Sequence, residues 1–326
     1  GFHRSAVEAC LPLFLDVTQK QAACWLQASR SGEAVNVTEA VSDAALQVIL
    51  QALFSTDLVD LTAQSFGLVS QHSKRDLRFA VKFRALGKLI QGFVDRRRNE
   101  NDYPPDLLTH AIRAVDRSSG EHMSDRQIID EMLTFVVAGH ETTAASLNWA
   151  WYLLAVNPDS MQRVVDEATR LDMARLDGDA LDSLVYTRAV LQEALRLYPP
   201  GWLYTRRALE DDQLGSYTLP AGSDVFICSY LLHRHPACWA HPDIFRPERF
   251  LGDGNIQRYA YLPFSAGPRH CIGETFANAE MLVHLAVIAS QLAAEMPDKQ
   301  VVELDTDVNL RPRHSLWLNF RENRYA

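Results

Sequence analysis

The sequence predicts a mainly α-helical protein with small β-sheets, and three observations support this. Apolar residues recur at the spacing of an amphipathic helix through most of residues 1–198. After Pro199 and Pro200 the pattern changes to short segments separated by glycine and proline, which is typical of strands and turns. The sequence contains no internal repeat and no low-complexity linker. We therefore expect a single helix-rich domain over residues 1–326.

Six stretches carry the helical pattern, and the longest is also the best delimited. It opens with a capping-box pair, Ser124 and Gln127, and ends before Pro158. At about 1.5 Å per residue it would span about 50 Å, enough to cross a whole domain. The predicted helices cover residues 6–26, 41–54, 79–94, 124–157, 182–198 and 272–296.

Strands are expected at three places between and after these helices. The stretch AVNVT at 34–38 is rich in β-branched residues and precedes a helix. The stretch LGSYTLPAGSDVFIC at 214–228 is predicted to form a hairpin, and SLWLNF at 315–320 a further strand.

Composition and charge exclude several classes of protein. A net charge of −9 argues against a nucleic-acid-binding protein, which normally carries a basic excess. No stretch approaches the roughly 20 consecutive apolar residues of a membrane span. No signal peptide can be read at the start, although a membrane anchor ahead of Gly1 stays open. The scattered cysteines form no CxxC pair and favour a reducing compartment, the cytoplasm: Cys10, Cys24, Cys228, Cys238 and Cys271.

The stretch PFSAGPRHCIGET at 263–275 places one cysteine on a glycine-flanked loop directly before a predicted helix. Backbone N–H groups at a helix start stabilise a thiolate, so Cys271 could be anionic. Gly267 and Gly273 carry no side chain where a flat ligand would approach the backbone. A buried cysteine acting as a small hydrophobic residue is the alternative. An anionic sulfur that faces something large and planar fits a haem iron.

The spacing F-x-x-G-x-R-x-C-x-G in this loop resembles the haem-binding loop of the cytochrome P450 superfamily. The matching residues are Phe264, Gly267, Arg269, Cys271 and Gly273. The resemblance implies that Cys271 is the axial ligand of the haem iron. It also implies that Arg269 pairs with a haem propionate and that Phe264 shields the sulfur.

The stretch AGHETTAAS lies in the middle of the longest predicted helix. Gly139 needs a reason, because glycine inside a helix costs about 1 kcal/mol relative to alanine. Gly139, Thr142 and Thr143 share one helix face, which would suit a close helix crossing with back-bonded threonines. By resemblance the stretch is the oxygen-activation motif: Ala138 and Gly139 border the haem and leave room for dioxygen. Glu141 and Thr142 would then deliver protons.

A pair three residues apart, Glu193 and Arg196, lies in the predicted helix that ends at the double proline. Such a pair on a helix surface contributes only a few tenths of a kcal/mol and by itself indicates little. With Arg249 in PERF it resembles the ExxR network of the family, which locks the cysteine loop in place. Loss of one member would leave an unpaired buried charge, at a cost of about 3–5 kcal/mol.

Two further arginines are assigned to haem propionates by resemblance. Arg206, favoured over its neighbour Arg207, follows the ExxR motif on a predicted strand. Arg4 resembles the arginine of the family's W-x-x-x-R helix, whose tryptophan would lie before Gly1.

A separate cluster within CSYLLHRHPACWAH leaves a zinc site open, because its ligand types suit the metal. Its spacing, however, is not that of a C-x-x-C/H-x-x-x-H module. The members are Cys228, His233, His235, Cys238 and His241.

The resemblance covers the chain from Arg4 to the last predicted strand and implies a triangular single domain. The haem would lie between the long central helix and the helix that follows the cysteine loop. Two parts are short: the N-terminal segment, and the lid helices expected near 54–76, with a junction in SQHSKR. We expect that both parts are missing from this sequence because they are disordered, and that the protein has not lost them.

The resemblance implies a haem-dependent monooxygenase with haem b, which inserts one atom of O2 into an organic substrate. Electrons would come from a separate ferredoxin- or flavodoxin-type donor or a reductase, because the chain carries no flavin or nicotinamide fingerprint. The particular residues of the motifs, AGHETTA, RLYPP and PERF, favour a hydrophobic small-molecule substrate that is lipid-like, terpenoid or polyketide. Two alternatives stay open: a peroxide-driven peroxygenase or isomerase, and a non-catalytic scaffold without haem.

Overall fold

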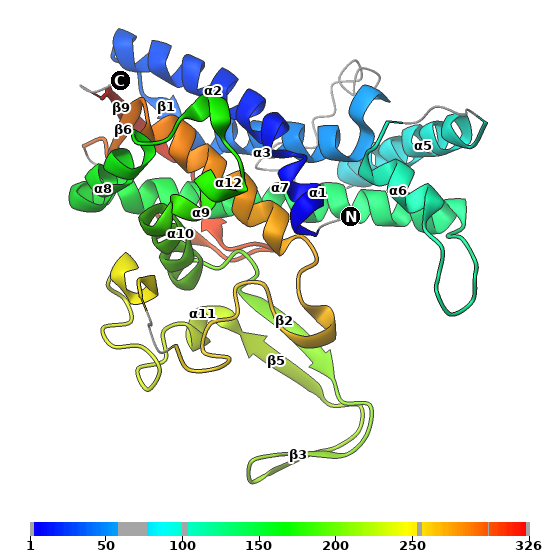
Figure 1. Cartoon of the computed structure of the whole chain (residues 1–326). Coiled ribbons are helices and arrows are strands. Elements are labelled where there is room, and N and C mark those ends of the chain that lie inside the picture. The colour runs from blue at the N-terminus through cyan, green and yellow to red at the C-terminus, as the bar shows by residue number, and fades with distance from the viewer. Residues whose placement is uncertain (1–2, 58–76, 100–103, 253–255, 299, 324–326) are drawn as a thin grey trace.

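The computed structural model describes residues 3–57, 77–99, 104–252, 256–298 and 300–323. Within these residues the protein is mainly helical with small sheets, as the sequence predicts (Figure 1). The predicted lid and its junction lie outside the described residues from residue 58 to residue 76.

The helices include all six predicted stretches in the predicted order, although several begin or end four or more residues from the predicted positions, and some shorter helices were not predicted. They are α1 (Arg4–Glu8), α2 (Leu11–Ser31), α3 (Val37–Phe54), α5 (Leu77–Asn99), α6 (Leu107–Arg113), α7 (Asp125–Val156), α8 (Pro158–Ala168), α9 (Gly178–Ser183), α10 (Val185–Leu197), α11 (Ser229–Leu232) and α12 (Glu274–Ala289).

Helix α7 runs through the middle of the molecule, and the other long helices pack around it (Figure 1). Its start has the predicted capping box, because Ser124 Oγ accepts the Gln127 amide and Gln127 Oε1 accepts the Ser124 amide at 2.9 Å. These two bonds satisfy backbone donors that the first turn of a helix leaves unpaired.

The main hydrophobic core lies where α2, α3 and α12 meet the C-terminal half of α7. Trp25, Trp151 and Phe320 contact one another there with ring centroids 4.6–5.7 Å apart. Aromatic side chains of this size dominate core energetics because they bury large areas. This packing joins α2, α7 and the strand β9 (Trp317–Glu322).

A second core lies beside the N-terminal half of α7 and is formed with α3, α5 and α6. Arg97 of α5 is buried within it and pairs with Asp57 at 2.7 Å and with Asp106 at 2.5 Å. Asp106 also caps α6 through the Thr109 amide. The buried cation thus joins three segments of this part of the fold.

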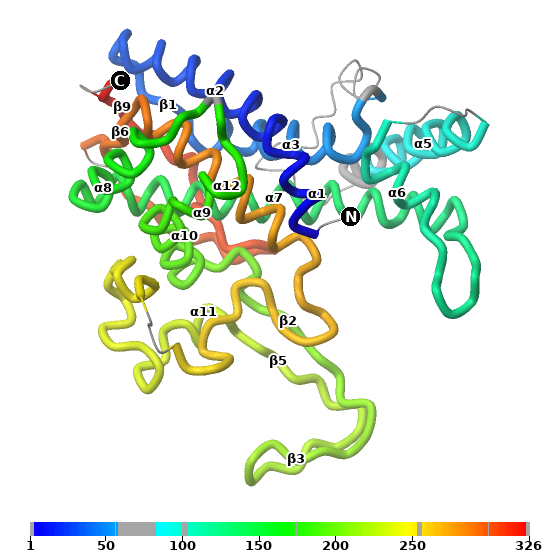
Figure 2. The backbone as a smooth tube through the Cα atoms, viewed as in Figure 1, coloured from blue at the N-terminus to red at the C-terminus, as the bar shows by residue number. Residues whose placement is uncertain are grey.

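The strands form small antiparallel sheets. β1 (Val35–Asn36) and β6 (Leu292–Glu295) pair with opposite ends of β9. The others are β2 (Leu203–Arg207), β3 (Asp212–Leu214), β4 (Tyr217–Leu219), β5 (Asp224–Cys228), β7 (Leu304–Asp305) and β8 (Arg311–Pro312). Figure 2 shows β1, β6 and β9 beside α2 and α8, and β2, β3 and β5 below the helices.

The predicted hairpin over 214–228 is wrong in its pairing. β4 pairs backward with β3 across a turn at Gly215, which has a φ of 62°. β5 pairs instead with β2, so that Arg206 lies opposite Val225. The hairpin β3–β4 is therefore nested inside a longer one, β2–β5, and the second turn at Gly222 returns the chain to it.

Two predicted helix boundaries are also corrected. The helix predicted over 6–26 is interrupted at Ala9 and Cys10, because Pro12 in the first turn of α2 starts a new helix. The helix predicted over 272–296 ends at Ala289, and the sequence that follows forms β6 because it pairs with β9. The tertiary pairing overrides the helical preference of its alanines.

Helix α3 is long and apolar enough to span a membrane by length and composition alone, with a mean hydropathy of 1.3. In the structure it packs against α7 and α2 and contributes buried side chains to both hydrophobic cores.

Candidate active site

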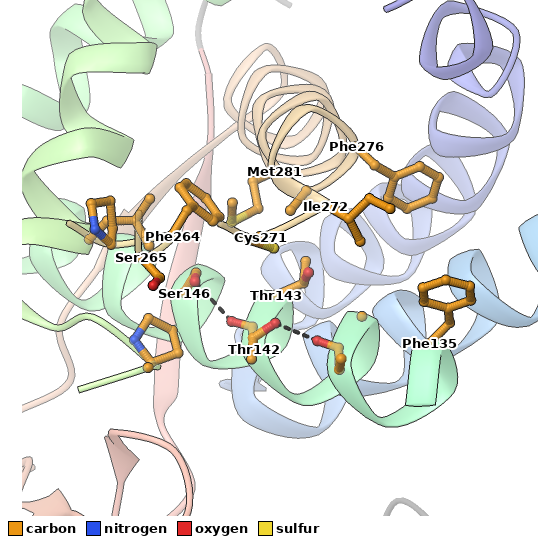
Figure 3. Close-up of a pocket in the computed structure, with 18 of the residues that line it drawn as sticks. Phe135, Thr142, Thr143, Ser146, Phe264, Ser265, Cys271, Ile272, Phe276 and Met281 are labelled. Atoms are coloured by element: carbon orange, nitrogen blue, oxygen red, sulfur yellow. Dashed lines mark hydrogen bonds between the residues drawn. The ribbon is translucent and has the colours of Figure 1, made fainter. Parts of the chain in front are cut away.

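A cavity lies between α7 and the loop that precedes α12 (Figure 3). Its empty space is about 1060 Å³, counted with its open mouth. Its walls are mainly apolar, and they come from six parts of the fold: α3, α7, α10, β2, the loop and α12. They include Ile49, Phe135, Leu195, Tyr204, Phe276 and Met281.

The cysteine loop holds Cys271 at the cavity wall (Figure 3). The chain makes a 3₁₀ turn that begins at Gly267, whose φ of 69° belongs to the left-handed region. The Cys271 amide donates to the Phe264 carbonyl at 2.9 Å, which closes the loop. Phe264, Arg269 and Gly273 of the motif also line the cavity.

The start of α12 acts on the sulfur. Burial raises the pKa of the Cys271 thiol and the charge of Glu274 adds to that rise, whereas hydrogen bonds from the Gly273 and Glu274 amides oppose it. Amides at a helix start favour the thiolate, so part of the predicted environment is present.

Across the cavity from the loop lies the AGHETTAAS stretch of α7, as Figure 3 shows. Ala138, Gly139, Thr142, Thr143 and Ser146 all contribute to the wall. The Thr142 hydroxyl donates to the Ala138 carbonyl at 2.6 Å, and the Ser146 hydroxyl donates to the Thr142 carbonyl at 2.8 Å. The back-bonding expected of threonine in a helix is thus present, and the Thr142 oxygen keeps acceptor capacity toward the cavity.

Gly139 also permits a close crossing of α3 and α7. A methyl group at this position would lie 3.0 Å from Cδ1 and 3.1 Å from Cγ1 of Ile49. These distances are shorter than ordinary van der Waals contacts, so the glycine has a packing role as well as a place on the cavity wall.

Glu141 is not among the residues that line the cavity. Its Oε2 accepts a hydrogen bond from Asn309 Nδ2 at 2.9 Å. The two predicted proton-delivering residues are therefore separated, and only Thr142 lies on the wall. Glu141 and Thr142 are consecutive, and consecutive side chains on a helix point about 100° apart around the axis, so the two do not share one face.

The structure brings Glu193, Arg196 and Arg249 together in one buried charge cluster. Arg196 donates to both carboxylate oxygens of Glu193 at 2.6 and 2.8 Å, and Arg249 adds a bond at 3.2 Å. Glu193 and Arg196 are both 0% exposed. The remaining N–H groups of the two arginines donate to backbone carbonyls of His233, Ala240, His241, Pro242 and Ile244.

The cysteine and histidine cluster left open as a zinc site is not gathered around one point. Among the described residues no group of three or more potential metal ligands is close enough to hold an ion. His233 points elsewhere, since Nε2 accepts the Leu262 amide at 2.8 Å and Nδ1 lies 3.2 Å from the Arg196 carbonyl. The sequence analysis did not predict that His233 binds Arg196 and Leu262. The signal that could have indicated it is the short distance along the chain from His233 to PERF at 247–250.

The three predicted propionate arginines have different positions. Arg269 lines the cavity. Arg206 lies beside it, on the same face of β2 as Tyr204, and donates to the Ser265 hydroxyl of the wall at 3.1 Å. Arg207 faces the other way and pairs with Asp224, as expected from the alternation along a strand.

Arg4 is placed away from the cavity, contrary to the prediction. Its guanidinium pairs with Glu8 of the same helix at 3.0 Å and with Asp182 of α9 at 2.9 Å. It lines a separate pocket beside α9 and the start of α12. The two carboxylates satisfy the cation there, so that Arg4 does not reach the cavity wall.

The residues present fit an iron macrocycle. A cysteine sulfur is a suitable ligand for the iron, and Arg269 is a suitable partner for an acidic substituent of the macrocycle. The remaining walls are mainly apolar, and Gly201 and Gly273 add no side chains to them. The donor set is therefore a sulfur at one wall, a cation at the edge and apolar surfaces between them.

Comparison with known proteins agrees with this geometry. A family model described as Cytochrome P450 matches residues 38–317. The chain is 40% identical over 218 residues to cyclooctatin synthase of Streptomyces melanosporofaciens, covering 66% of this chain and 48% of that one. It is 30% identical over 319 residues to cyclooctat-9-en-7-ol 5-monooxygenase of the same organism, covering 89% and 68%. The match thus spans about half the length of the first of these relatives.

Solved structures show the same fold. The crystal structure of the cytochrome P450DA heme domain superposes with a TM-score of 0.88 at 26% identity. The superposition covers 99% of this chain and 75% of that one. Family and fold together imply a haem cofactor with its iron. The chain belongs to the cytochrome P450 family.

Proposed function

We propose that the protein is a haem-thiolate monooxygenase that binds haem b through Cys271. The observation that carries the proposal is the position of Cys271 on one cavity wall with the Gly139–Thr142 stretch of α7 on the opposite wall. The haem would supply the chemistry that activates O2, so that one oxygen atom enters the substrate and the other leaves as water.

The chain's own residues would have separate roles around the cofactor. Cys271 would ligate the iron as a thiolate, with Phe264 excluding water from the sulfur. Arg269 and Arg206 would orient the macrocycle through its propionates. Thr142 would hold a water molecule in place and pass a proton into the cavity through its hydroxyl. Glu193, Arg196 and Arg249 would have a structural role, keeping the segment 233–249 in position.

The proposed substrate is a hydrophobic small molecule, terpenoid, lipid-like or polyketide. The apolar walls formed by Phe135, Ile272 and Phe276 support this class. One relative is named as a monooxygenase of cyclooctat-9-en-7-ol, which supports an unsaturated cyclic alcohol or a similar compound. A screen of terpenoids, fatty acids and polyketides for ligand-induced shifts of the haem band would discriminate among them.

The proposal includes a separate electron donor, of the ferredoxin or flavodoxin type or a reductase, and a cytoplasmic location. Membership of the cytochrome P450 family supports a redox partner that supplies the electrons. The free state of the five cysteines in the structure supports a reducing compartment.

A carbon monoxide difference spectrum of the reduced, haem-loaded chain tests the proposal. A red-shifted Soret band is expected, and Cys271→Ser should abolish it because the iron loses its sulfur ligand. Cys24→Ser is the matched control, since Cys24 is exposed on α2 and should leave the band unchanged. No band in the unmodified chain, or a band that persists in C271S, would overturn the assignment.

A further inference from the structure

We propose that His233 is a positioning residue for the cysteine loop. Its imidazole joins the buried Glu193–Arg196 pair to the backbone of Leu262, where the loop begins. The inference rests on the proposed function only in that it takes this loop to be the cofactor loop. The contacts themselves belong to the protein chain.

The imidazole makes one hydrogen bond on each side. The Leu262 amide donates to Nε2 at 2.8 Å. An amide N–H can only donate, so Nε2 carries a lone pair and the proton of the neutral ring lies on Nδ1. Nδ1 then donates to the Arg196 carbonyl at 3.2 Å. Arg196 in turn donates to the His233 carbonyl at 2.8 Å, so the two residues bind each other twice.

Burial keeps the ring in this form. His233 is 0% exposed, and the Tyr261 ring lies 5.3 Å away between centroids. Burial, together with the nearby charges of Arg196 and Arg234, lowers the pKa of His233 to about 4. The neutral imidazole is therefore the form present near neutral pH, with one donor and one acceptor fixed on opposite sides of a rigid ring.

The bond to Leu262 continues toward the cysteine through the loop backbone. Phe264, two residues further on, accepts the Cys271 amide at 2.9 Å. The Ser229 hydroxyl reaches the Leu262 carbonyl only at 3.5 Å, which is a weak contact. His233 thus provides the stronger of these two side-chain contacts to the backbone where the loop begins.

Two substitutions separate the two bonds of the ring. In His233→Gln the amide oxygen can occupy the place of Nε2 and accept the Leu262 amide. In His233→Asn the shorter amide can replace Nδ1 toward Arg196 but cannot reach Leu262. Both residues are polar amides that fill less volume than imidazole, and Asn and Gln differ by one methylene. The pair therefore tests the bond to Leu262 while keeping the polarity of the side chain the same.

Amide hydrogen exchange of the full chain without haem measures the effect. His233→Asn should accelerate exchange of the Leu262 and Cys271 amides about tenfold compared with the unmodified chain, after correction for any change in global stability. This is the effect expected from the loss of about one hydrogen bond. His233→Gln should leave both within about threefold of the unmodified chain, which is the rescue that simple packing would not give. His284→Gln is the matched control, because this buried histidine binds Trp151 and Gln21 and does not contact the loop. Equal acceleration in the Asn and Gln variants, or none in either, would overturn the proposal.

Nitrogen NMR of the unmodified chain provides a test that needs no variant. A protonated Nδ1 with an unprotonated Nε2 at His233 is expected, together with a scalar coupling between Nε2 and the Leu262 amide nitrogen. A protonated Nε2 would overturn the proposal even if His233→Asn fails to fold. Neither measurement involves the iron, so its outcome is independent of the carbon monoxide spectrum that tests Cys271.

Discussion

Ile49 reaches the cavity wall through the space that Gly139 leaves open on α7. A β-carbon at residue 139 would lie 3.0 Å from Ile49 Cδ1. This is closer than an ordinary van der Waals contact, so either Ile49 or one of the two helices would have to move. Both residues line the cavity. The need for glycine at residue 139 therefore arises from the close crossing of α3 and α7 as well as from the space required in the cavity.

Gly139→Ala should therefore destabilise the chain even though alanine favours helix. Overpacking costs about 1–3 kcal/mol, whereas the gain in helix propensity is about 1 kcal/mol. We expect a net loss of up to about 2 kcal/mol in the free energy of unfolding, measured in urea on the chain without haem. In an Ile49→Val background the loss should shrink, because the nearest atom, Cδ1, is gone.

Gly92→Ala is the control for the propensity term. Gly92 lies in α5, where an added methyl group would meet open space. Alanine there should stabilise by up to about 1 kcal/mol. If Gly139→Ala stabilises by the same amount, the Ile49 contact does not restrict residue 139.

Arg196→Leu should be strongly destabilising, because among the described residues it leaves the buried carboxyl group of Glu193 with Arg249 as its remaining side-chain partner. Removing one partner of a buried pair costs about 3–5 kcal/mol. The backbone carbonyls of His233 and Pro242 also lose their side-chain donor, while that of Ile244 keeps Arg249. Urea unfolding monitored by tryptophan fluorescence measures the loss.

The exposed pair Arg207–Asp224 provides the comparison for Arg196→Leu. Its side chains are 67% and 45% exposed, and Arg207→Ala should cost less than about 1 kcal/mol. A loss of similar size in both variants would show that burial does not decide the cost.

Motif spacing along the sequence was sufficient where contacts are local or belong to one loop. Cys271 and Arg269 are two residues apart, and both lie on the cavity wall. The contact of Ile49 with Gly139 was not predictable, because it depends on how closely two helices 90 residues apart cross. The position of Arg4 was not predictable, because an arginine in FHRSA carries no information about its distant partner Asp182 of α9. The sequence of β6 predicts the end of a helix, because its pairing with β9 cannot be inferred from local sequence.

Thr142→Ala distinguishes an enzyme that uses O2 from one driven by peroxide. Glu141 binds Asn309 and is not on the cavity wall, so this carboxylate alone does not favour the O2 reaction. If Thr142 passes protons to bound oxygen, its loss should reduce product per electron consumed about 10-fold or more, with the missing electrons recovered as hydrogen peroxide.

Thr142→Ser keeps the hydroxyl and is the matched variant for this test. It should retain most of the coupling between electron use and product. A peroxide-driven enzyme, by contrast, should form product from added peroxide equally well with Thr, Ser or Ala at residue 142.

His284 makes the stability of the chain depend on pH in a predictable direction. Trp151 Nε1 donates to its Nδ1 at 3.3 Å and Gln21 Oε1 accepts from its Nε2 at 2.7 Å, so a second ring proton would face the indole N–H. Burial lowers the pKa of His284 to about 3. The unfolded chain takes up a proton near pH 6.5 that the folded chain does not, so stability falls as pH drops below about 6.5.

The contribution of His284 to the pH dependence of stability is best measured as the difference between the unmodified chain and His284→Gln. Burial raises the pKa of Glu280 well above its usual value, and that group opposes the histidine by losing stability as pH rises. Each group changes the slope of unfolding free energy against pH by at most about 1.4 kcal/mol per unit. His284→Gln should therefore flatten the slope between pH 6 and 5 by about 1.4 kcal/mol per unit, measured from urea midpoints. His314→Gln, at an exposed position, should leave the slope unchanged. An unaltered slope in H284Q would mean that the folded chain protonates His284 as readily as the unfolded chain does.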